Sequence, residues 1–331
     1  LGSYEQMRLS AIQSSNTLTI FDPASAPVAP VRPNKLQNTA LAGVVGALLA
    51  LGVVFLIEYL DDTLKNSEDV SRVLGLSTLG VIGQFGKESD ELITAHHPLA
   101  SVSEDFRVLR TNLRFAGVDK ALRTILVTSP APVEGKTVTA ANLAVVLAQS
   151  GLRVALVDAD LRRPRQHHLF NIPSGAEGLT ESLVEGKTDG RITQPLADFD
   201  LRLLPAGALP PNPVEMVGSQ RMRQLLEGLA SEADVVVVDS PPVLSMADAA
   251  VLAQAVDGVL LAVEANKTRR GAAQDAVLSL QQIGANVLGV VLTQVPQRNS
   301  RYYYYYREYY DADGEKKRVR GKRRHSRAPR D

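Results

Sequence analysis

The longest apolar stretch of the chain lies near its beginning. Residues 39–57 contain no charged side chain and are dense in Ala, Val, Leu and Gly. A helix of this length spans the hydrocarbon core of a bilayer, which is about 30 Å at about 1.5 Å per residue. A buried helix of a soluble domain normally keeps one polar stripe, and a cleaved signal peptide lies closer to the start of a chain. The pattern therefore predicts a transmembrane helix at 39–57.

From about residue 101 the pattern changes to short apolar runs that alternate with helical stretches. The runs are rich in β-branched residues and apolar throughout, which is typical of parallel strands covered on both faces. We expect strands at Thr124–Thr128, Val154–Val157, Leu201–Leu204, Val235–Val238, Val259–Val263 and Val287–Leu292. We expect helices at Val138–Gln149, Arg221–Leu229, Ala247–Ala255 and Gly271–Ile283. The alternation predicts an α/β fold with a doubly wound, mostly parallel sheet.

Composition and charge exclude several kinds of chemistry. The sequence has no cysteine, so a disulfide framework, a thiol nucleophile and thiolate metal sites are ruled out. Its five histidines do not show the spacing of a zinc site. The formal net charge is zero, yet residues 316–330 carry basic charges only. A tail of this kind attracts anionic partners or simply stays solvated, and we expect no nucleic-acid partner.

Tyrosine is concentrated in one polar segment close to the end of the sequence. Seven of the nine tyrosines are Tyr302, Tyr303, Tyr304, Tyr305, Tyr306, Tyr309 and Tyr310. Hydrophobic cores space their tyrosines apart, because each buried hydroxyl needs a hydrogen-bond partner. A run flanked by Arg301, Arg307 and Glu308 resembles a presented substrate, so these tyrosines are predicted phosphoacceptors if the chain binds ATP upstream.

A phosphate-binding loop is predicted between the first strand and the first helix of this α/β region. Strand Thr124–Thr128 leads into Ser129–Thr137, and a helix follows directly. Gly135 allows the backbone to approach phosphates, Lys136 can reach β and γ oxygens, and the Thr137 hydroxyl can ligate Mg²⁺. The helix start adds N–H groups and a positive dipole end. Residues predicted to contact the nucleotide are Pro132, Val133, Glu134, Gly135, Lys136, Thr137, Val138 and Arg162.

Carboxylates follow two other predicted strands. Asp158 and Asp160 come after Val154–Val157, and Asp239 comes after Val235–Val238. Ligands of doubly wound sheets bind at the carboxyl ends of the strands, so these side chains should converge on the loop. Phosphoryl transfer needs Mg²⁺, a lysine and a carboxylate that orients or deprotonates the attacking hydroxyl. The predicted catalytic residues are Lys136, Asp158, Asp160 and Asp239, with Asp158 favoured as base and Thr137, Asp160 and Asp239 organising Mg²⁺.

Taken together, these motifs resemble those of the bacterial tyrosine kinases, or BY-kinases, that act with polysaccharide co-polymerases in capsule and exopolysaccharide production. Ser129–Thr137 is similar to their Walker A motif, although Pro130 replaces the first glycine of the general pattern. Val154–Arg162 is similar to Walker A′ and Val235–Asp239 to Walker B. Glu104, Arg107 and Arg110 resemble the family's oligomerisation motif, whose spacing places charges along one side of a helix. Thr293 stands where relatives often have Asn near the adenine.

The resemblance implies a particular activity, cofactors and partners. It implies a protein-tyrosine kinase that uses ATP and Mg²⁺ and autophosphorylates its tyrosine cluster in trans within a ring-like homo-oligomer. The implied partners are further copies of the chain, the polysaccharide polymerase and export machinery, a tyrosine phosphatase, and the membrane. Because an ATP-dependent domain needs the cytosol, the expected location is the cell membrane, with a single visible pass and a cytoplasmic kinase domain.

The pattern along the chain, together with the resemblance, predicts the domain organisation. Residues 1–38, proline-rich in their second half, would be the extracytoplasmic end of a co-polymerase module, and 39–57 its transmembrane helix. Residues 58–100 are expected as a juxtamembrane connector with a short strand near Thr78–Ile82, followed by the kinase domain at 101–296. Residues 297–331 would be a disordered tyrosine-rich, basic tail. The start at Leu1 rather than Met suggests that an upstream portion is missing.

Two other classes of protein remain open. A membrane-associated partitioning or positioning ATPase shares the fold and the Asp-x-Asp strand end. Such ATPases carry an additional lysine five positions before the Walker lysine, where this chain has Ala131, and they lack a tyrosine tail. A co-polymerase with a non-catalytic nucleotide domain would not need the intact set of Lys136, Asp158, Asp160 and Asp239.

Overall fold

The computed structural model describes residues 2–14, 32–85, 91–117, 121–186, 193–196 and 198–296. The predicted tyrosine cluster and basic tail, and most of the proline-rich segment, lie outside these residues. The chain divides into two compact units, residues 1–61 and 62–331, which are described separately.

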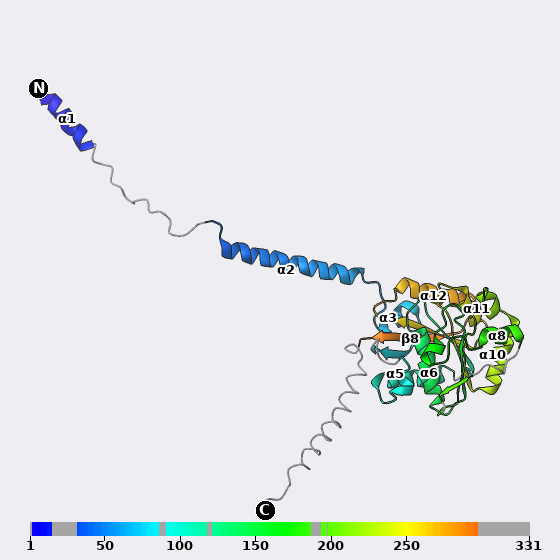
Figure 1. Cartoon of the computed structure of the whole chain (residues 1–331). Coiled ribbons are helices and arrows are strands. Elements are labelled where there is room, and N and C mark those ends of the chain that lie inside the picture. The colour runs from blue at the N-terminus through cyan, green and yellow to red at the C-terminus, as the bar shows by residue number, and fades with distance from the viewer. Residues whose placement is uncertain are drawn as a thin grey trace, which may run out of the picture. The chain divides into compact units, whose positions relative to one another are not determined.

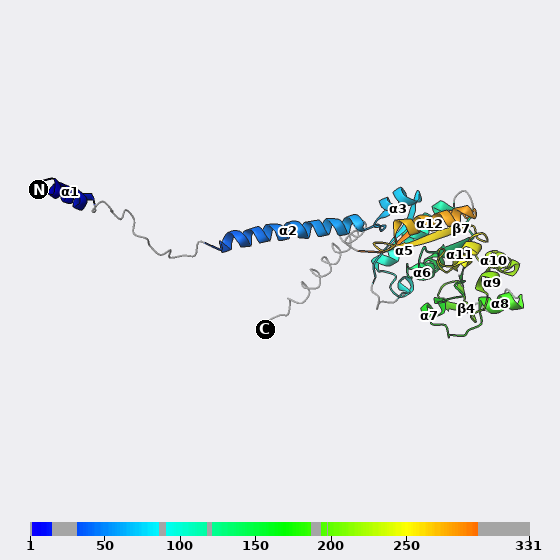
Figure 2. The same ribbon diagram turned by 90° about the horizontal axis from the view of Figure 1, so that it is seen from above.

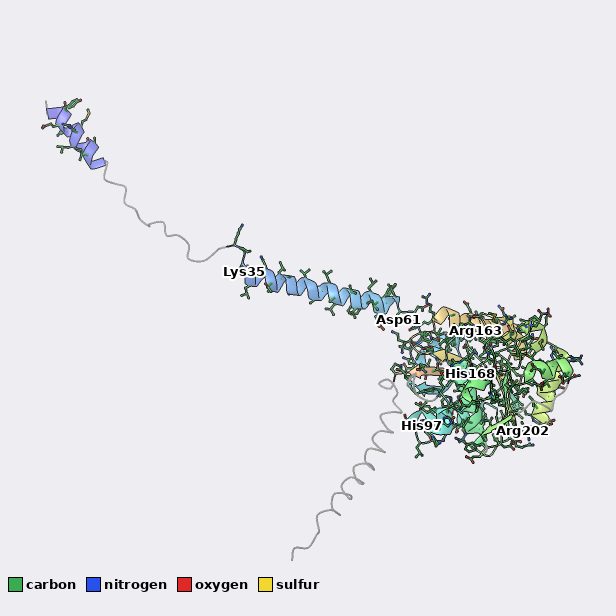
Figure 3. The ribbon with its side chains drawn as sticks, viewed as in Figure 1. Lys35, Asp61, His97, Arg163, His168 and Arg202 are labelled. Atoms are coloured by element: carbon green, nitrogen blue, oxygen red, sulfur yellow. The ribbon has the colours of Figure 1, made fainter. Side chains whose placement is uncertain are left out.

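The first unit consists of two helices, α1 (Gly2–Ser14) and α2 (Lys35–Leu60). Helix α2 is 26 residues long, has a mean hydropathy of 2.7 in its most apolar window and contains no buried residue. Its side chains project on all sides between the labelled Lys35 and Asp61 (Figure 3). Among the described residues, it is the helix with the length and composition to cross a membrane. The segment predicted at 39–57 lies within it.

The second unit is built on one sheet, in which the described residues form eight strands in the order β1-β8-β7-β2-β6-β3-β5-β4. The strands are β1 (Thr78–Gly83), β2 (Thr124–Thr128), β3 (Val154–Asp158), β4 (Thr193–Leu196), β5 (Leu201–Leu204), β6 (Val235–Asp239), β7 (Gly258–Glu264) and β8 (Val287–Val295). All neighbouring pairs are parallel except β4 with β5, at one edge. The predicted α/β fold with a mostly parallel sheet is therefore confirmed (Figures 1 and 2).

Helices cover both faces of this sheet. They are α3 (Ser67–Leu74), α4 (Ile93–His96), α5 (Ser101–Ala116), α6 (Lys136–Ala148), α7 (Gln166–Leu169), α8 (Leu179–Glu185), α9 (Pro213–Val217), α10 (Gln220–Glu232), α11 (Ala247–Ala253) and α12 (Arg270–Gln282). The core separates into two clusters, one containing α10, α11 and α12 and the other α5 and α6. Alternate strand residues supply them: Leu126 belongs to the first, and Ile125 and Val127 to the second. This two-sided core explains why the strands are apolar throughout.

The segment between α2 and α5, expected as a juxtamembrane connector at 58–100, contributes a strand to the main sheet. Strand β1 pairs in parallel with β8 and so belongs to the main sheet. Leu64 is fully buried, and its N–H donates to the Thr268 carbonyl oxygen at 3.0 Å. In return, the Asn266 N–H donates to the Leu64 carbonyl oxygen at 2.9 Å. The compact unit therefore begins at Asp62, whereas the sequence placed the start of the kinase domain at 101.

A carboxylate on α5 makes the stability of this unit depend on pH. The Gly83 N–H at the end of β1 donates to Asp105 Oδ2 at 2.9 Å. Burial raises the pKa of Asp105 from 3.8 to about 6; the Gly83 hydrogen bond opposes this rise, and the nearby Glu104 adds to it. Because the pKa is raised in the folded state, the protonated carboxyl favours folding. Its contribution is complete below about pH 4 and is lost as the pH rises through about 6.

The Asp105→Asn variant should remove this dependence, because the amide is neutral and its oxygen still accepts from Gly83. Between pH 5 and 7.5, the parent protein should lose about 1 kcal/mol more unfolding free energy than the variant. Urea denaturation at both pH values measures the difference. Equal losses in the two proteins would show that Asp105 does not titrate in this range.

Candidate active site

The candidate site lies where three neighbouring strands end. Strand β6 pairs with β2 on one side and with β3 on the other, so the loops that follow these strands emerge side by side. The predicted phosphate-binding loop follows β2, the Asp158–Asp160 segment lies at the end of β3, and Asp239 lies at the end of β6. This is the edge at which doubly wound sheets bind their ligands.

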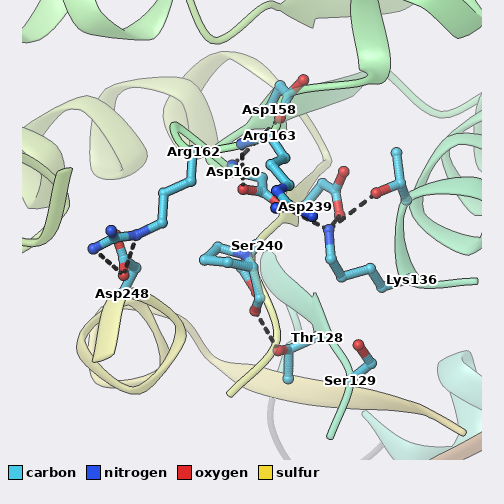
Figure 4. A network of polar contacts seen from close by, with 12 residues as sticks. Thr128, Ser129, Lys136, Asp158, Asp160, Arg162, Arg163, Asp239, Ser240 and Asp248 are labelled. Carbon is cyan, nitrogen blue, oxygen red and sulfur yellow. Dashed lines mark hydrogen bonds and ion pairs between the residues drawn. The ribbon is translucent and has the colours of Figure 1, made fainter. Parts of the chain in front are cut away.

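Lys136 and the predicted carboxylates converge there, as expected. Lys136 Nζ lies 2.8 Å from Asp160 Oδ2 and 3.8 Å from Asp239 Oδ1, and it is 3.1 Å from Thr137 Oγ1 (Figure 4). Burial disfavours the charged ammonium, but the Asp239 and Asp160 carboxylates outweigh this effect and raise the pKa of Lys136. The lysine is therefore cationic and oriented by the carboxylates.

Asp158 is fully buried beside this cluster. Its Oδ1 accepts from the Asp160 N–H at 3.3 Å and its Oδ2 from the Gln166 N–H at 3.0 Å. Burial, followed by repulsion from Asp239, raises the pKa of Asp158 to about 8. Burial also raises the pKa of Asp239, although Lys136 opposes the rise. Two carboxylates, Asp160 and Asp239, pair with the one ammonium, and the buried Asp158 lies beside them, so the site favours an additional cation.

The oxygen-rich donor set fits Mg²⁺. Carboxylate and hydroxyl oxygens are its preferred protein ligands, and the ion usually keeps several waters while binding one or two carboxylates and substrate phosphates. In the part of the chain that the structure describes, no three His, Asp or Glu side chains are arranged to hold a metal ion directly. Thr137, Asp160 and Asp239 would therefore hold Mg²⁺ together with water and nucleotide oxygens.

The phosphate-binding loop adopts a backbone conformation that favours close approach of a ligand. Val133 has φ 62° and Gly135 has φ 87°, both in the left-handed region. Val133 is 78% exposed, and Gly135 directly precedes the first residue of α6. A β-branched residue with positive φ is uncommon and needs support from its surroundings.

Glu134 provides this support from inside the loop. It is 2% exposed, and its Oε2 accepts from the Ala131 N–H at 2.7 Å while its Oε1 accepts from the Thr268 hydroxyl. The Thr293 hydroxyl donates to the Glu134 carbonyl oxygen at 2.8 Å, and Lys267 Nζ donates to the Val133 carbonyl oxygen at 2.8 Å. The Glu134 side chain thus braces the loop, so a contact between Glu134 and the nucleotide would come from its backbone.

Removal of the Thr268 hydroxyl should weaken nucleotide binding. In the Thr268→Val variant, the buried Glu134 carboxylate loses a donor, and the strained loop loses part of its support. We expect the Kd for ADP to rise by about ten-fold, which corresponds to about 1.4 kcal/mol, within the usual cost of such a loss. Isothermal titration calorimetry measures the change. The control is Thr111→Val on α5, where an exposed hydroxyl bonds the Arg107 carbonyl oxygen; equal affinities in all three proteins would contradict the bracing role.

Arg162 lies in this region but faces away from the lysine. Its Nε donates to Asp248 Oδ2 at 3.1 Å, and its NH2 group is 3.1 Å from the same oxygen. Asp248 is 1% exposed and lies on α11, so the pair ties the loop after β3 to that helix. Arg162 was predicted to contact the nucleotide, and in this structure its guanidinium is engaged by Asp248 (Figure 4).

Two residues of the site were missed by the sequence analysis. Asp248 belongs to a helix predicted from its apolar pattern alone, and an acidic residue in the first turn of a helix is ordinary. Gln166 is fully buried among the carboxylates. No motif marks it, since a glutamine eight positions after Asp158 has no signature of its own.

A small pocket adjoins the start of α6. It has a volume of about 90 Å³ and is lined by Ile82, Phe85, Glu91, Phe106, Gly135, Val138, Thr139, Thr293 and Gln294. The walls combine aromatic rings with a few polar groups, as small-molecule sites generally do. Thr293, the residue that the resemblance places near the adenine, belongs to this lining.

The three residues of the predicted oligomerisation motif all lie on α5. Arg107 pairs with Glu104 at 2.8 Å and donates to the Pro98 carbonyl oxygen at 2.7 Å. Arg110 NH1 donates to the Val146 carbonyl oxygen in the last turn of α6 at 3.0 Å. Arg110 therefore already has a role within the subunit, and a role of the motif in assembly stays a prediction.

The fold and the site define a nucleotide-binding protein of the P-loop class. The model of the CobQ/CobB/MinD/ParA nucleotide binding domain matches residues 125–322. Tyrosine-protein kinase YwqD of Bacillus subtilis is 37% identical over 215 residues, which cover 65% of this chain and 90% of YwqD. The crystal structure of the chimerical protein CapA2B2 matches with a TM-score of 0.65 and 36% identity, over 70% of this chain and 100% of the other.

The similarity to one relative extends through the apolar helix. Tyrosine-protein kinase etk of Escherichia coli K12 is 30% identical over 325 residues, which cover 92% of this chain and 45% of etk. The chain thus spans less than half of this longer relative. It belongs to the bacterial tyrosine-kinase family, within the nucleotide-binding family named above.

Proposed function

We propose that the chain is an ATP-dependent protein-tyrosine kinase that converts ATP and protein tyrosine to ADP and protein phosphotyrosine. The observation that carries the proposal is the buried constellation of Lys136 with Asp158, Asp160 and Asp239 at the ends of three adjacent strands. Its cationic and carboxylate groups are those that phosphoryl transfer from a magnesium nucleotide requires.

The nucleotide phosphates would lie on the loop at 132–138 and the positive end of α6. Lys136 would exchange its contact with Asp160 for β- and γ-phosphate oxygens. Thr137, Asp160 and Asp239 would then hold Mg²⁺, which neutralises charge on the phosphates when bound. The purine would extend toward the pocket that contains Thr293.

In the transfer, a tyrosine oxygen attacks the γ-phosphorus while the bond from that phosphorus to the ADP oxygen breaks. The phenolic proton passes to Asp158 in its ionised form, and the bonding electron pair leaves with ADP. The proposed acceptors are the seven tyrosines at 302–306, 309 and 310. They would enter the site of a neighbouring copy, because a short tail that follows β8 need not reach its own γ-phosphate.

The proposed setting is a ring-like assembly at the cell membrane. Residues 39–57 would cross the bilayer, with 1–38 outside and the kinase domain in the cytoplasm, where ATP is available. The partners would be polysaccharide polymerase and export proteins and a tyrosine phosphatase. Each phosphate adds a charge of about −1.5 to −2, so multiple phosphorylation would loosen the ring through repulsion.

Mass spectrometry of the full chain, purified in detergent and incubated with Mg-ATP, tests the activity. We expect phosphate esters on several of the tyrosines at 302–310. If the protein binds or hydrolyses ATP yet acquires no phosphotyrosine, the kinase assignment fails and a switch-type NTPase is the better account.

Separate alanine variants test the assembly. Arg107→Ala should reduce the size of the assembly measured by light scattering, with little effect on the melting temperature, because its intrasubunit partners are partly exposed. Arg110→Ala should additionally lower the melting temperature, since the Val146 carbonyl oxygen at the end of α6 loses its donor. If both variants keep the parent's assembly size, α5 is not an interface.

Particular residues argue against a partitioning ATPase and against a non-catalytic co-polymerase. Ala131 stands at the position of the additional lysine of the former. The charged residues that a non-catalytic domain could lose are present and in contact with one another.

A further inference from the structure

Gln166 occupies the centre of the proposed active site. It is fully buried at the start of α7. Its Nε2 donates to Asp239 Oδ2 at 2.9 Å and to the Thr137 carbonyl oxygen at 3.1 Å. Its backbone N–H donates to Asp158 Oδ2 at 3.0 Å. One residue thus connects the three loops that form the site.

These partners determine how the carboxamide is oriented. Asp239 Oδ2 and the Thr137 carbonyl oxygen are both acceptors, so the NH₂ group must face them. The Oε1 atom consequently points to the other side of the carboxamide.

The Gln166 and Asp239 side chains, which are hydrogen-bonded to each other, each have one buried oxygen without a hydrogen-bond partner among the described residues. These oxygens are Gln166 Oε1 and Asp239 Oδ1. The nearest cation to the latter, Lys136 Nζ, is 3.8 Å away, which is longer than a hydrogen bond. Buried acceptors normally have donors, and a pair that lacks them in a functional site indicates a bound group. The Gln166 oxygen can only accept, and so can the Asp239 oxygen when the carboxylate is ionised, so that group must present hydrogens or positive charge.

We propose that Gln166 is a positioning residue of the magnesium site. Its carboxamide fixes one oxygen of Asp239. Its own Oε1, together with Asp239 Oδ1, accepts hydrogen bonds from water molecules bound to Mg²⁺. This inference rests on the proposed function, because it assumes a magnesium nucleotide on the phosphate loop. It agrees with the ion's tendency to keep its waters, and with the described part of the chain, where no three His, Asp or Glu side chains are arranged to hold a metal ion directly.

The test compares ADP binding with and without the metal. The full chain in detergent is titrated with ADP by calorimetry in excess Mg²⁺ and in EDTA, and the ratio of the two Kd values reports the contribution of Mg²⁺. Gln166→Met keeps the length of the side chain but removes both polar atoms. We expect the ratio to fall roughly ten-fold, because outer-sphere partners of metal sites contribute effects of this size, while the Kd in EDTA stays within about two-fold.

Two further variants separate acceptance of a hydrogen bond from packing. Gln166→Glu keeps an acceptor oxygen but removes the donor to Asp239 Oδ2, so its ratio should lie between those of the parent and Gln166→Met. Gln149→Met is the matched control, because Gln149 Nε2 bonds the Thr94 carbonyl oxygen at the far end of α6, away from the carboxylates. It should leave the ratio unchanged. Thermal unfolding of each protein verifies that it is folded.

Three results would overturn the inference: an unchanged ratio in Gln166→Met, an equal weakening of binding with and without Mg²⁺, or a matching fall in Gln149→Met. None of these measurements needs an acceptor tyrosine. Magnesium-dependent ADP binding that requires Gln166, in a protein that never forms phosphotyrosine, would leave the inference standing while the proposed kinase activity fails. If phosphotyrosine forms but substitution of Gln166 does not change the ratio, the kinase activity stands and the inference about Gln166 fails.

Discussion

The Asp158→Asn variant is expected to be more stable than the parent protein and to form almost no phosphotyrosine. Asp158 is fully buried, and its pKa is raised to about 8 by burial and by Asp239, so the ionised carboxylate opposes folding. The neutral carboxyl contributes stability that is complete below about pH 4 and is lost as the pH rises through about 8. Asparagine is neutral at every pH, and its oxygen can still accept from the Gln166 N–H.

In EDTA at pH 8.5, the gain should be at least about 2 kcal/mol, or at least about 4 °C in melting temperature for a unit of this size. Loss of a general base should lower the transfer rate by about 10²–10⁴. The control is Asp234→Asn, which removes an exposed ion pair with Arg153 and should not raise the melting temperature. A stabilised variant with the parent's activity would exclude Asp158 as the base, and an unstabilised variant would contradict the electrostatic cost of its charge.

The second large effect concerns Lys136. The transfer rate of the Lys136→Met protein with an intact tail should fall by a factor of at least about 10²–10³. The uncharged methionine side chain cannot stabilise the phosphate oxygens as the lysine ammonium does. When it is mixed with active protein that lacks residues 297–331, phosphotyrosine should appear on the Lys136→Met chain. Mass spectrometry of the separated chains measures this transfer in trans.

The same substitution leaves the buried carboxylates of Asp160 and Asp239 without their ammonium partner, which can cost about 3–5 kcal/mol in stability. Thermal unfolding in the presence of Mg²⁺ therefore accompanies the assay. Arg202→Met, which breaks an exposed pair with Glu232, serves as the folded control. If the folded Lys136→Met chain stays free of phosphotyrosine in the mixture, transfer in trans is excluded.

Much of the fold and the position of the site could be predicted because their signals are local. Strands β2 and β5 begin and end at the predicted residues, and the other predicted strands differ only at their ends. Their uninterrupted aliphatic runs follow from burial on both faces. The loops that carry Lys136, Asp158 and Asp239 follow three of these strands, so their meeting in space was implied by the parallel topology.

The rest depends on contacts between residues far apart in the sequence, which no local pattern encodes. The inward direction of Glu134 is set by Thr268, and the pairing of Arg162 by Asp248. Strand β1 joins β8 across more than two hundred residues. An isolated short apolar run such as Thr78–Gly83 has the same composition whether it pairs in a sheet or lies in a connector.

The place of β1 matters for anyone who prepares a soluble fragment of this protein. A fragment that begins at residue 101 would lack β1, α3 and Leu64, and the nine residues of β8 would become an unpaired edge. Long apolar edge strands associate with one another and aggregate. Oligomers formed by such a fragment could therefore be mistaken for the proposed ring, whereas a fragment that begins at Asp62 keeps β8 paired with β1.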